Sequence, residues 1–239
     1  MLKRILVVSA HPSAGDIGAG GLMSRHSYDG DEVYLLIMSR GEAGIPDIRP
    51  EDLASIREKE QREAAKILGV SEVFFLGLKD TEIFDTLEAR LMVVDVIRRL
   101  KPDIVVTHSE VDTHPDHRAT AYITFAAAMY SSLPTVKSKS NLPPHLVKAV
   151  YTYGLPGYTP TFIPEIYLDI NEFFERKCKA ICCYETTMKH LGWSRERWIE
   201  TWLSLDRVYG ISSGVRYAEG FRQFWSSHLG RRAVNHLTW

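Results

Sequence analysis

Short runs of consecutive apolar residues recur along the first 170 residues of the chain. Runs of this kind, four to eight residues long, are typical of strands that are buried on both faces of a sheet. We therefore predict strands over residues Ile5–Ser9, Val33–Met38, Glu72–Leu76, Ile104–Thr107, Val147–Tyr153 and Ile166–Ile170.

The segments between these runs have apolar residues at helical spacing. In one of them, Leu91, Val94 and Ile97 recur every three residues, which places them on one face of a helix. Gly69 stands where a helix would end, and Ser194 where one would begin. We predict helices over residues Ile17–Met23, Ser55–Leu68, Leu87–Leu100, Ala119–Tyr130, Asn171–Tyr184 and Arg195–Leu205.

Strand and helix alternate through the first 130 residues. This alternation predicts an α/β fold, Rossmann-like, with a mostly parallel sheet flanked by helices. The chain of 239 residues fits one domain over residues 1–239, because strands resume directly after the polar loop at residues 137–144. Ligands of such sheets bind beyond the carboxyl ends of the strands, so the residues that follow each strand are the candidates for chemistry.

Composition narrows the range of partners. The formal net charge of −1 gives no reason to expect a nucleic-acid partner. The apolar run at the amino terminus is too short for a signal peptide, and no later run is long enough for a membrane span.

The three cysteines crowd into residues 178–183 without a CxxC motif, so they are interpreted as core thiols. We expect a cytoplasmic protein without membrane insertion.

The richest chemical segment follows the fourth predicted strand. Residues 108–117 contain three histidines and three carboxylates, with His114 and His117 on either side of Pro115 and Asp116. Such a cluster at a strand end suits a divalent metal, zinc above all. A nearby carboxylate also orients an imidazole for acid catalysis. The alternative is a solvated polar loop that ends in the cap of the next helix.

A second histidine, His11, follows the first predicted strand. Small residues come after it, including Gly18, Gly20 and Gly21, but they match no phosphate-binding motif. We interpret these glycines as positions that let the first helix lie close to the sheet. Asp16, within this stretch, is either the N-cap of that helix or a functional carboxylate.

Together these segments resemble the PIG-L or LmbE-like family of zinc-dependent deacetylases, which act on N-acetyl sugars. The first family motif, Ala-His-Pro-Asp-Asp followed by a glycine-rich stretch, matches Ala10-His11-Pro12 and the three glycines. The second motif, His-Pro-Asp-His, matches residues 114–117 in full. The segments at residues 40–44, 75–80 and 214–219 are also similar, so the resemblance covers nearly the whole chain in order.

The resemblance implies a zinc site and an oxyanion-stabilising or acidic histidine. Carried over residue by residue, it assigns zinc to His11 and His117, and the catalytic step to His114 with Asp116 as its partner. The chain departs from the family at two positions: Ser13 stands where the general base is expected, and Ala14 where a zinc-binding aspartate is expected. Catalytic zinc usually has three protein ligands, so a further ligand is needed.

Asp16 is the first candidate for that ligand, and Glu110 and Asp112 are others. The resemblance implies that Arg57 points into the substrate pocket, although Arg57 has the alternative of an exposed helix charge. Glu42 and Asp80 are candidates for contacts with sugar hydroxyls. The expected activity is hydrolysis of the N-acetyl amide of a small sugar-like substrate. The alternatives are a catalytically inactive binding protein or partner subunit, and a hydratase-like enzyme on the same fold. A homo-oligomer is expected because oligomers are common in the resembled family.

Overall fold

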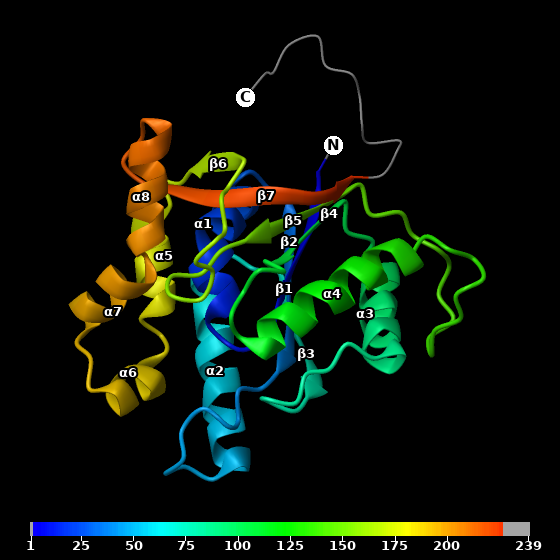
Figure 1. Ribbon diagram of the computed structural model, residues 1–239, viewed down its shortest axis with the longest axis horizontal. Helices are drawn as coiled ribbons and strands as arrows, with labels where there is room; N and C mark the ends of the chain where they lie inside the picture. The colour runs from blue at the N-terminus through cyan, green and yellow to red at the C-terminus, as the bar shows by residue number, and fades with distance from the viewer. Residues whose placement is uncertain (1, 227–239) are drawn as a thin grey trace.

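A seven-stranded sheet forms the centre of the computed structural model, which describes residues 2–226 (Figure 1). The strand order is β3-β2-β1-β4-β5-β7-β6. The first five strands are parallel, and β7 runs antiparallel to both β5 and β6. The strands are β1 (Arg4–Ser9), β2 (Glu32–Ser39), β3 (Glu72–Leu78), β4 (Ile104–His108), β5 (Ala149–Tyr153), β6 (Ile166–Asp169) and β7 (Ala218–Ser226).

Helices form a layer on each side of this sheet. On one side α1 (Ala14–Tyr28), α2 (Pro50–Leu68) and α5 (Phe174–Ile181) pack against one another, and on the other side α3 (Leu87–Leu100) packs against α4 (Pro115–Tyr130). The prediction of an α/β fold with a mostly parallel sheet is therefore confirmed. Within the described part of the chain, no helix combines the length and the apolar character that crossing a membrane requires.

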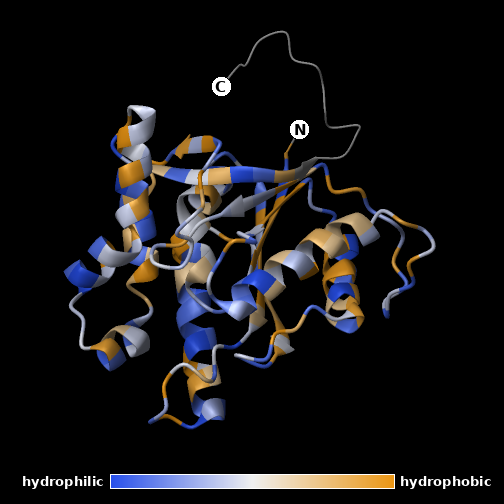
Figure 2. Ribbon diagram, viewed as in Figure 1, coloured by the Kyte–Doolittle hydropathy of each residue, from blue (hydrophilic) through white to orange (hydrophobic). Residues whose placement is uncertain are grey.

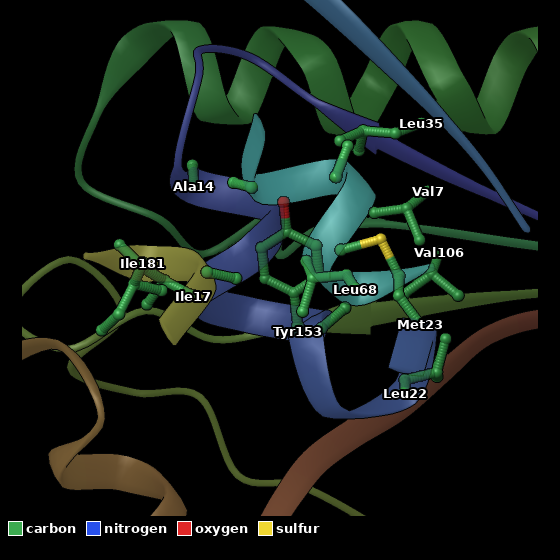
Figure 3. Packing of buried hydrophobic residues seen from close by; sticks show 14 of the residues in the cluster. Val7, Ala14, Ile17, Leu22, Met23, Leu35, Leu68, Val106, Tyr153 and Ile181 are labelled. Atoms are coloured by element: carbon green, nitrogen blue, oxygen red, sulfur yellow. The ribbon is translucent and has the colours of Figure 1, made fainter. Parts of the chain in front are cut away.

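The alternation of side chains along β1 divides the core into two clusters. Ile5 and Val7 belong to the cluster beneath α1, α2 and α5, whereas Leu6 and Val8 belong to the cluster beneath α3 and α4. All four side chains are fully buried because both faces of the sheet are covered, as the apolar run predicted. Figure 3 shows part of the first cluster, and Figure 2 shows hydrophobic residues along the central strands and hydrophilic ones along much of α2.

Helix α1 lies unusually close to the sheet. A Cβ atom added to Gly18 would lie 2.2 Å from Cδ2 of Tyr153, and one added to Gly21 would lie 2.4 Å from Cγ2 of Ile170. Contacts that short are sterically forbidden, so these two positions require glycine. The interpretation of the glycines as a packing feature is confirmed, and close packing fixes the start of α1 beside the end of β1.

The region after α5 differs most from the prediction. It contains three short helices, α6 (Glu185–Leu191), α7 (Arg195–Trp202) and α8 (Ser204–Ser213). Ser194 caps α7 as predicted, with its side chain accepting the N–H of Arg197. Strand β7 was missed because polar and charged residues interrupt its apolar positions, so it does not form a continuous apolar run.

Candidate functional site

The histidine segments meet at a cavity of about 260 Å³ beyond the carboxyl ends of the parallel strands. His11 follows β1, Asp80 follows β3, and His114 is the N-cap residue of α4, which follows β4. All three line the cavity together with His117. The structure thus brings together side chains from distant parts of the sequence, at the edge of the sheet where the fold places ligands.

Three histidine rings lie side by side in this cavity. The ring centroids of His11 and His117 are 5.3 Å apart, those of His11 and His114 are 5.0 Å apart, and those of His114 and His117 are 4.5 Å apart. One nitrogen from each ring lies within 4.8 Å of the others. The expected convergence of the two motifs is therefore present.

His117 is oriented by a buried carboxylate. Its Nδ1 lies 2.9 Å from Oδ2 of Asp112, whose Oδ1 accepts the backbone N–H of His114 at 2.8 Å. Burial lowers the pKa of His117 although Asp112 opposes the shift. A neutral imidazole that donates from Nδ1 keeps a lone pair on Nε2, which is the arrangement typical of metal-binding histidines. In the sequence Asp112 was only a minor candidate for a metal ligand.

His114 is held in the opposite tautomer. Its Nδ1 accepts the backbone N–H of Asp116 at 3.2 Å, so the ring proton is on Nε2. Burial and the neighbouring histidines His117 and His11 lower its pKa. At neutral pH His114 is therefore an uncharged hydrogen-bond donor, which suits stabilisation of an oxyanion better than donation of a proton.

His11 contacts two carboxylates at once. Its Nε2 lies 2.9 Å from Oδ1 of Asp80 and 2.9 Å from Oδ2 of Asp116. Burial would lower the pKa of His11, but the hydrogen bonds to Asp116 and Asp80 raise it. Conversely, burial would raise the pKa of Asp80, but the hydrogen bond and charge of His11 bring it down to about 2. Asp116 thus faces His11, whereas the sequence interpretation made it the partner of His114.

Asp16 stands apart from these potential ligands. Among the described residues, the groups of side chains with metal-ligand spacing do not include it. Its fully buried Oδ2 accepts hydrogen bonds from Nε2 of Gln61 at 2.9 Å and from the hydroxyl of Tyr184. Burial raises the pKa of Asp16 to about 6. The structure thus places Asp16 apart from the groups with metal-ligand spacing, and residue 13, not Asp16, occupies the N-cap position.

Arg57 lines the cavity, but its contacts are also structural. Its Nη1 donates to the carbonyl of Gly41 at 3.1 Å, and its Nη2 donates to the carbonyl of Pro12 at 3.2 Å. A Cβ atom at residue 41 would lie 2.5 Å from Nη1, so Gly41 makes room for the guanidinium. Arg57 is therefore neither a fully exposed helix charge nor a residue that only contacts a substrate. It is part-buried, bonded to two backbone carbonyls, and still lines the cavity.

Glu42 supports Asp80 from behind. Its Oε1 accepts the backbone N–H of Asp80 at 2.9 Å, and it is not among the residues that line the cavity. Glu42 therefore supports a residue of the cavity lining, and its contact with a substrate stays a prediction. Asp80 itself does line the cavity, as expected for a substrate contact.

An aromatic wall on the other side of the cavity was missed in the sequence. It consists of Tyr158, Trp198 and Trp202, and the rings of Tyr158 and Trp202 are stacked with centroids 6.2 Å apart. Nε1 of Trp202 is buried without a hydrogen-bond partner. The four-residue spacing of the two tryptophans on a predicted helix was the available signal, since it places both on one face.

Comparisons with known proteins agree with this geometry. The sequence pattern of the family described as PIG-L: GlcNAc-PI de-N-acetylase matches residues 6–128. A diacetylchitobiose deacetylase from Thermococcus kodakarensis is 31% identical over 229 residues, covering 92% of this chain and 83% of that protein. A 4-oxalmesaconate hydratase from Pseudomonas putida is 27% identical, covering 92% of this chain and 88% of that protein.

A solved structure supports the same relationship in three dimensions. The N,N'-diacetylchitobiose deacetylase from Pyrococcus horikoshii, in complex with an inhibitor, superimposes with a TM-score of 0.81 at 30% identity. The match covers 93% of this chain and 84% of that one. The fold, the motif positions and these similarities lead to one conclusion: the chain belongs to the PIG-L family of de-N-acetylases.

Proposed function

We propose that this protein hydrolyses the N-acetyl amide of a small sugar-like substrate with the help of a bound divalent metal, zinc being the expected ion. The observation that carries the proposal is the convergence of His11, His114 and His117 on one cavity. The relatives that act on diacetylchitobiose, an N-acetylated sugar, support the substrate class.

The side chains of the cavity fit a metal. His11 belongs to two of the potential ligand groups, one with His114 and His117 and one with Asp80 and Asp116. The Asp112 contact leaves Nε2 of His117 free to bind a cation. When bound, such a metal supplies Lewis-acid polarisation of the amide carbonyl and of a water molecule.

The chain's own residues then account for the rest of the reaction. Water adds to the amide carbon, the C–N bond breaks, and acetate and a free amine leave. His114 donates its Nε2–H to the carbonyl oxygen as negative charge develops there. The proton of the attacking water must reach the leaving nitrogen, and Ser13 at the position of the family's base is too weakly basic to carry it. We therefore expect slow turnover.

Recognition of a sugar ring is assigned to the aromatic wall and Arg57. Stacked aromatic rings such as Tyr158 and Trp202 offer an apolar face to the C–H groups of a pyranose. Arg57 lines the same cavity and can donate hydrogen bonds to a sugar hydroxyl.

The proposal is tested by measuring acetate release from N-acetylglucosamine and from N,N'-diacetylchitobiose with zinc-loaded protein. We expect slow release that is lost in His114→Ala, while His145→Ala, which removes a histidine outside the cavity, keeps it. Failure of both substrates with fully metal-loaded protein would count against the proposal.

Hydration of a carboxylate-bearing substrate is the second candidate. Its specific support is Arg57, which forms no ion pair with any described residue although it lines the cavity. A guanidinium on the cavity lining is a natural partner for a carboxylate. The similarity to 4-oxalmesaconate hydratase is in keeping with this candidate. Addition of water to an unsaturated dicarboxylate, without acetate release from N-acetyl sugars, would favour it over the first.

A further inference from the structure

Ser13 lies at the cavity in a strained backbone conformation. Its φ is 81° and its ψ is −34°, a combination that residues other than glycine rarely adopt. Among the described residues, four other than glycine have a positive φ, and Ser13 and Thr81 are the two of them that line the cavity. Such conformations persist only where the surrounding structure enforces them, and they gather at functional sites.

Two side chains of α2 clamp the peptide group between Pro12 and Ser13. Nη2 of Arg57 donates to the carbonyl of Pro12 at 3.2 Å, and Oε1 of Gln61 accepts the N–H of Ser13 at 3.0 Å. Residues 57 and 61 are four apart on one helix, so they lie on the same face. On the other side of Ser13, its carbonyl accepts the N–H of Ile17 at 2.9 Å. Both peptide groups that flank Ser13 are therefore held, which fixes its φ and ψ.

Gln61 is itself held in one orientation. It is 1% exposed, and its Nε2 donates to Oδ2 of Asp16 at 2.9 Å. The hydroxyl of Tyr184 donates to the same oxygen. The amide of Gln61 cannot be reversed, because the N–H of Ser13 needs an acceptor and the carboxylate of Asp16 needs a donor. Asp16 and Tyr184 thus form a buried support for Gln61.

The hydroxyl of Ser13 is left for another partner. Ser13 is the N-cap residue of α1, where a serine side chain ordinarily accepts an N–H of the first turn, but it makes no such hydrogen bond. Oγ of Ser9 accepts the N–H of Gly15 at 3.0 Å instead. Because Ser13 is partly exposed and lines the cavity, its hydroxyl can donate to and accept from a bound ligand.

We propose that Ser13 binds the substrate through its hydroxyl, and that Gln61 is the positioning residue that holds this hydroxyl at the cavity. The proposal rests on the proposed function for the identity of the ligand, an N-acetyl sugar, whose hydroxyl and amide groups can form hydrogen bonds with a serine. Ser13 then contributes to binding and not to proton transfer. Gln61 is not among the residues that line the cavity, so it acts through Ser13.

The test measures ligand binding by the full chain. The dissociation constant of N-acetylglucosamine is determined by titration calorimetry for the natural protein, for Ser13→Ala, for Gln61→Met and for the double variant. Ser24→Ala is the matched control, because it removes a buried hydroxyl of α1 outside the cavity. Gln61→Glu, which keeps an acceptor for the N–H of Ser13, is the conservative variant. Circular dichroism confirms that each variant is folded.

We expect Ser13→Ala and Gln61→Met each to weaken binding about 3–10-fold, which is the usual value of one uncharged hydrogen bond. Ser24→Ala should change it less than about twofold. In the double variant the two losses should not multiply, because Gln61 acts only through Ser13. Gln61→Glu should bind the sugar more tightly than Gln61→Met.

Melting temperatures test the strained conformation separately. Ser13→Gly and Ser13→Ala both lose the hydroxyl, but only glycine adopts a positive φ without strain. We expect Ser13→Gly to melt at least about 2 °C above Ser13→Ala, because the relief of strain exceeds the cost of the added flexibility. Equal melting temperatures would show that Ser13 is not held in this conformation, which would overturn the role of Gln61.

The binding results decide the rest of the proposal. Unchanged binding in Ser13→Ala would overturn it, as would a double variant in which the two single losses multiply. Absence of binding by the natural protein would overturn it as well. Acetate release from N-acetyl sugars with unchanged binding in Ser13→Ala would leave the deacetylase activity intact and refute this contact. The expected losses of binding without any acetate release would do the reverse.

Discussion

Nδ1 of His117 lies 2.9 Å from Oδ2 of Asp112, and both side chains are almost entirely buried. This contact fixes the tautomer of His117, so that its Nε2 presents a lone pair to the cavity. Asp112 also accepts the backbone N–H of His114. One carboxylate therefore sets the geometry of both histidines of the second motif.

Replacing this carboxylate by its amide should disturb the chemistry more than the fold. In Asp112→Asn an N–H can face Nδ1 of His117, which moves the ring proton to Nε2 and removes the lone pair. We expect metal-dependent turnover to fall ~10–100-fold, with the circular dichroism spectrum unchanged. Equal turnover in the natural protein and in Asp112→Asn would show that the tautomer of His117 is irrelevant.

Restoring the family's two aspartates should accelerate acetate release. Ser13 and Ala14 both line the cavity, and Ala14 is the first residue of α1 (Figure 3). General-base assistance is typically worth ~10²–10⁴-fold. We expect the double variant Ser13→Asp/Ala14→Asp to release acetate from N-acetylglucosamine at least ~10-fold faster than the natural protein.

The two changes should also be non-additive, because a base acts only on water that a metal has activated. Initial rates of the two single variants and the double variant give the coupling directly. A double variant that binds zinc fully but stays inert on N-acetyl sugars would favour the hydratase candidate or a non-catalytic role.

Arg57 should contribute to both binding and stability. Its guanidinium donates to backbone carbonyls of two different loops, and hydrogen bonds from charged groups contribute ~1.5–3 kcal/mol. We expect Arg57→Ala to raise KM and to lower the melting temperature by several degrees (~2–4 °C per kcal/mol). Arg40→Ala, which removes a half-exposed arginine paired with Glu58, is the control. A raised KM at unchanged melting temperature would mean that the two loop contacts contribute nothing.

Asp16 should make stability depend on pH. Its carboxyl keeps a proton up to about pH 6 in the folded chain, because burial raises its pKa from 3.8. The folded state therefore binds more protons than the unfolded state between about pH 4 and 6, and stability falls as pH rises through this window. Asp16→Asn does not titrate, so it should lack this loss of ~3 kcal/mol.

Urea unfolding of the natural protein and Asp16→Asn at several pH values measures this difference. The free energy of unfolding of the variant, relative to the natural protein, should increase from pH 4 to pH 7. A difference that is constant with pH would place the pKa of Asp16 at its ordinary value.

Local sequence patterns were enough to predict the central strands and the two histidine motifs. The apolar runs of β1 and β4 marked strands that both helix layers cover, and the two histidine motifs follow those strands. Which carboxylate faces which histidine could not be read in this way. Asp80 and Asp116 are 36 residues apart in the numbering. They meet at His11 because β3, which precedes Asp80, and β4, which precedes Asp116, lie on opposite sides of β1 in the sheet.

Similar reasons explain why the surroundings of Asp16 and Glu42 could not be predicted. Asp16 is close to His11 in sequence, but the first turns of α1 carry it toward Gln61 and Tyr184. Glu42 is directed at the backbone of Asp80. The aromatic wall depends on how α7 packs over the cavity, which local periodicity does not reveal.

The central claim is that this site hydrolyses an N-acetyl amide and needs a metal to do so. The most direct measurement is acetate release from N,N'-diacetylchitobiose by chelator-treated protein as zinc is added back in increments. It is made for the natural chain and for His11→Ala, which removes a residue shared by two of the three groups with metal-ligand spacing. We predict release that is absent without metal, rises until one ion is bound per chain, and is abolished in His11→Ala. Metal-independent release, or equal release by His11→Ala, would contradict the account.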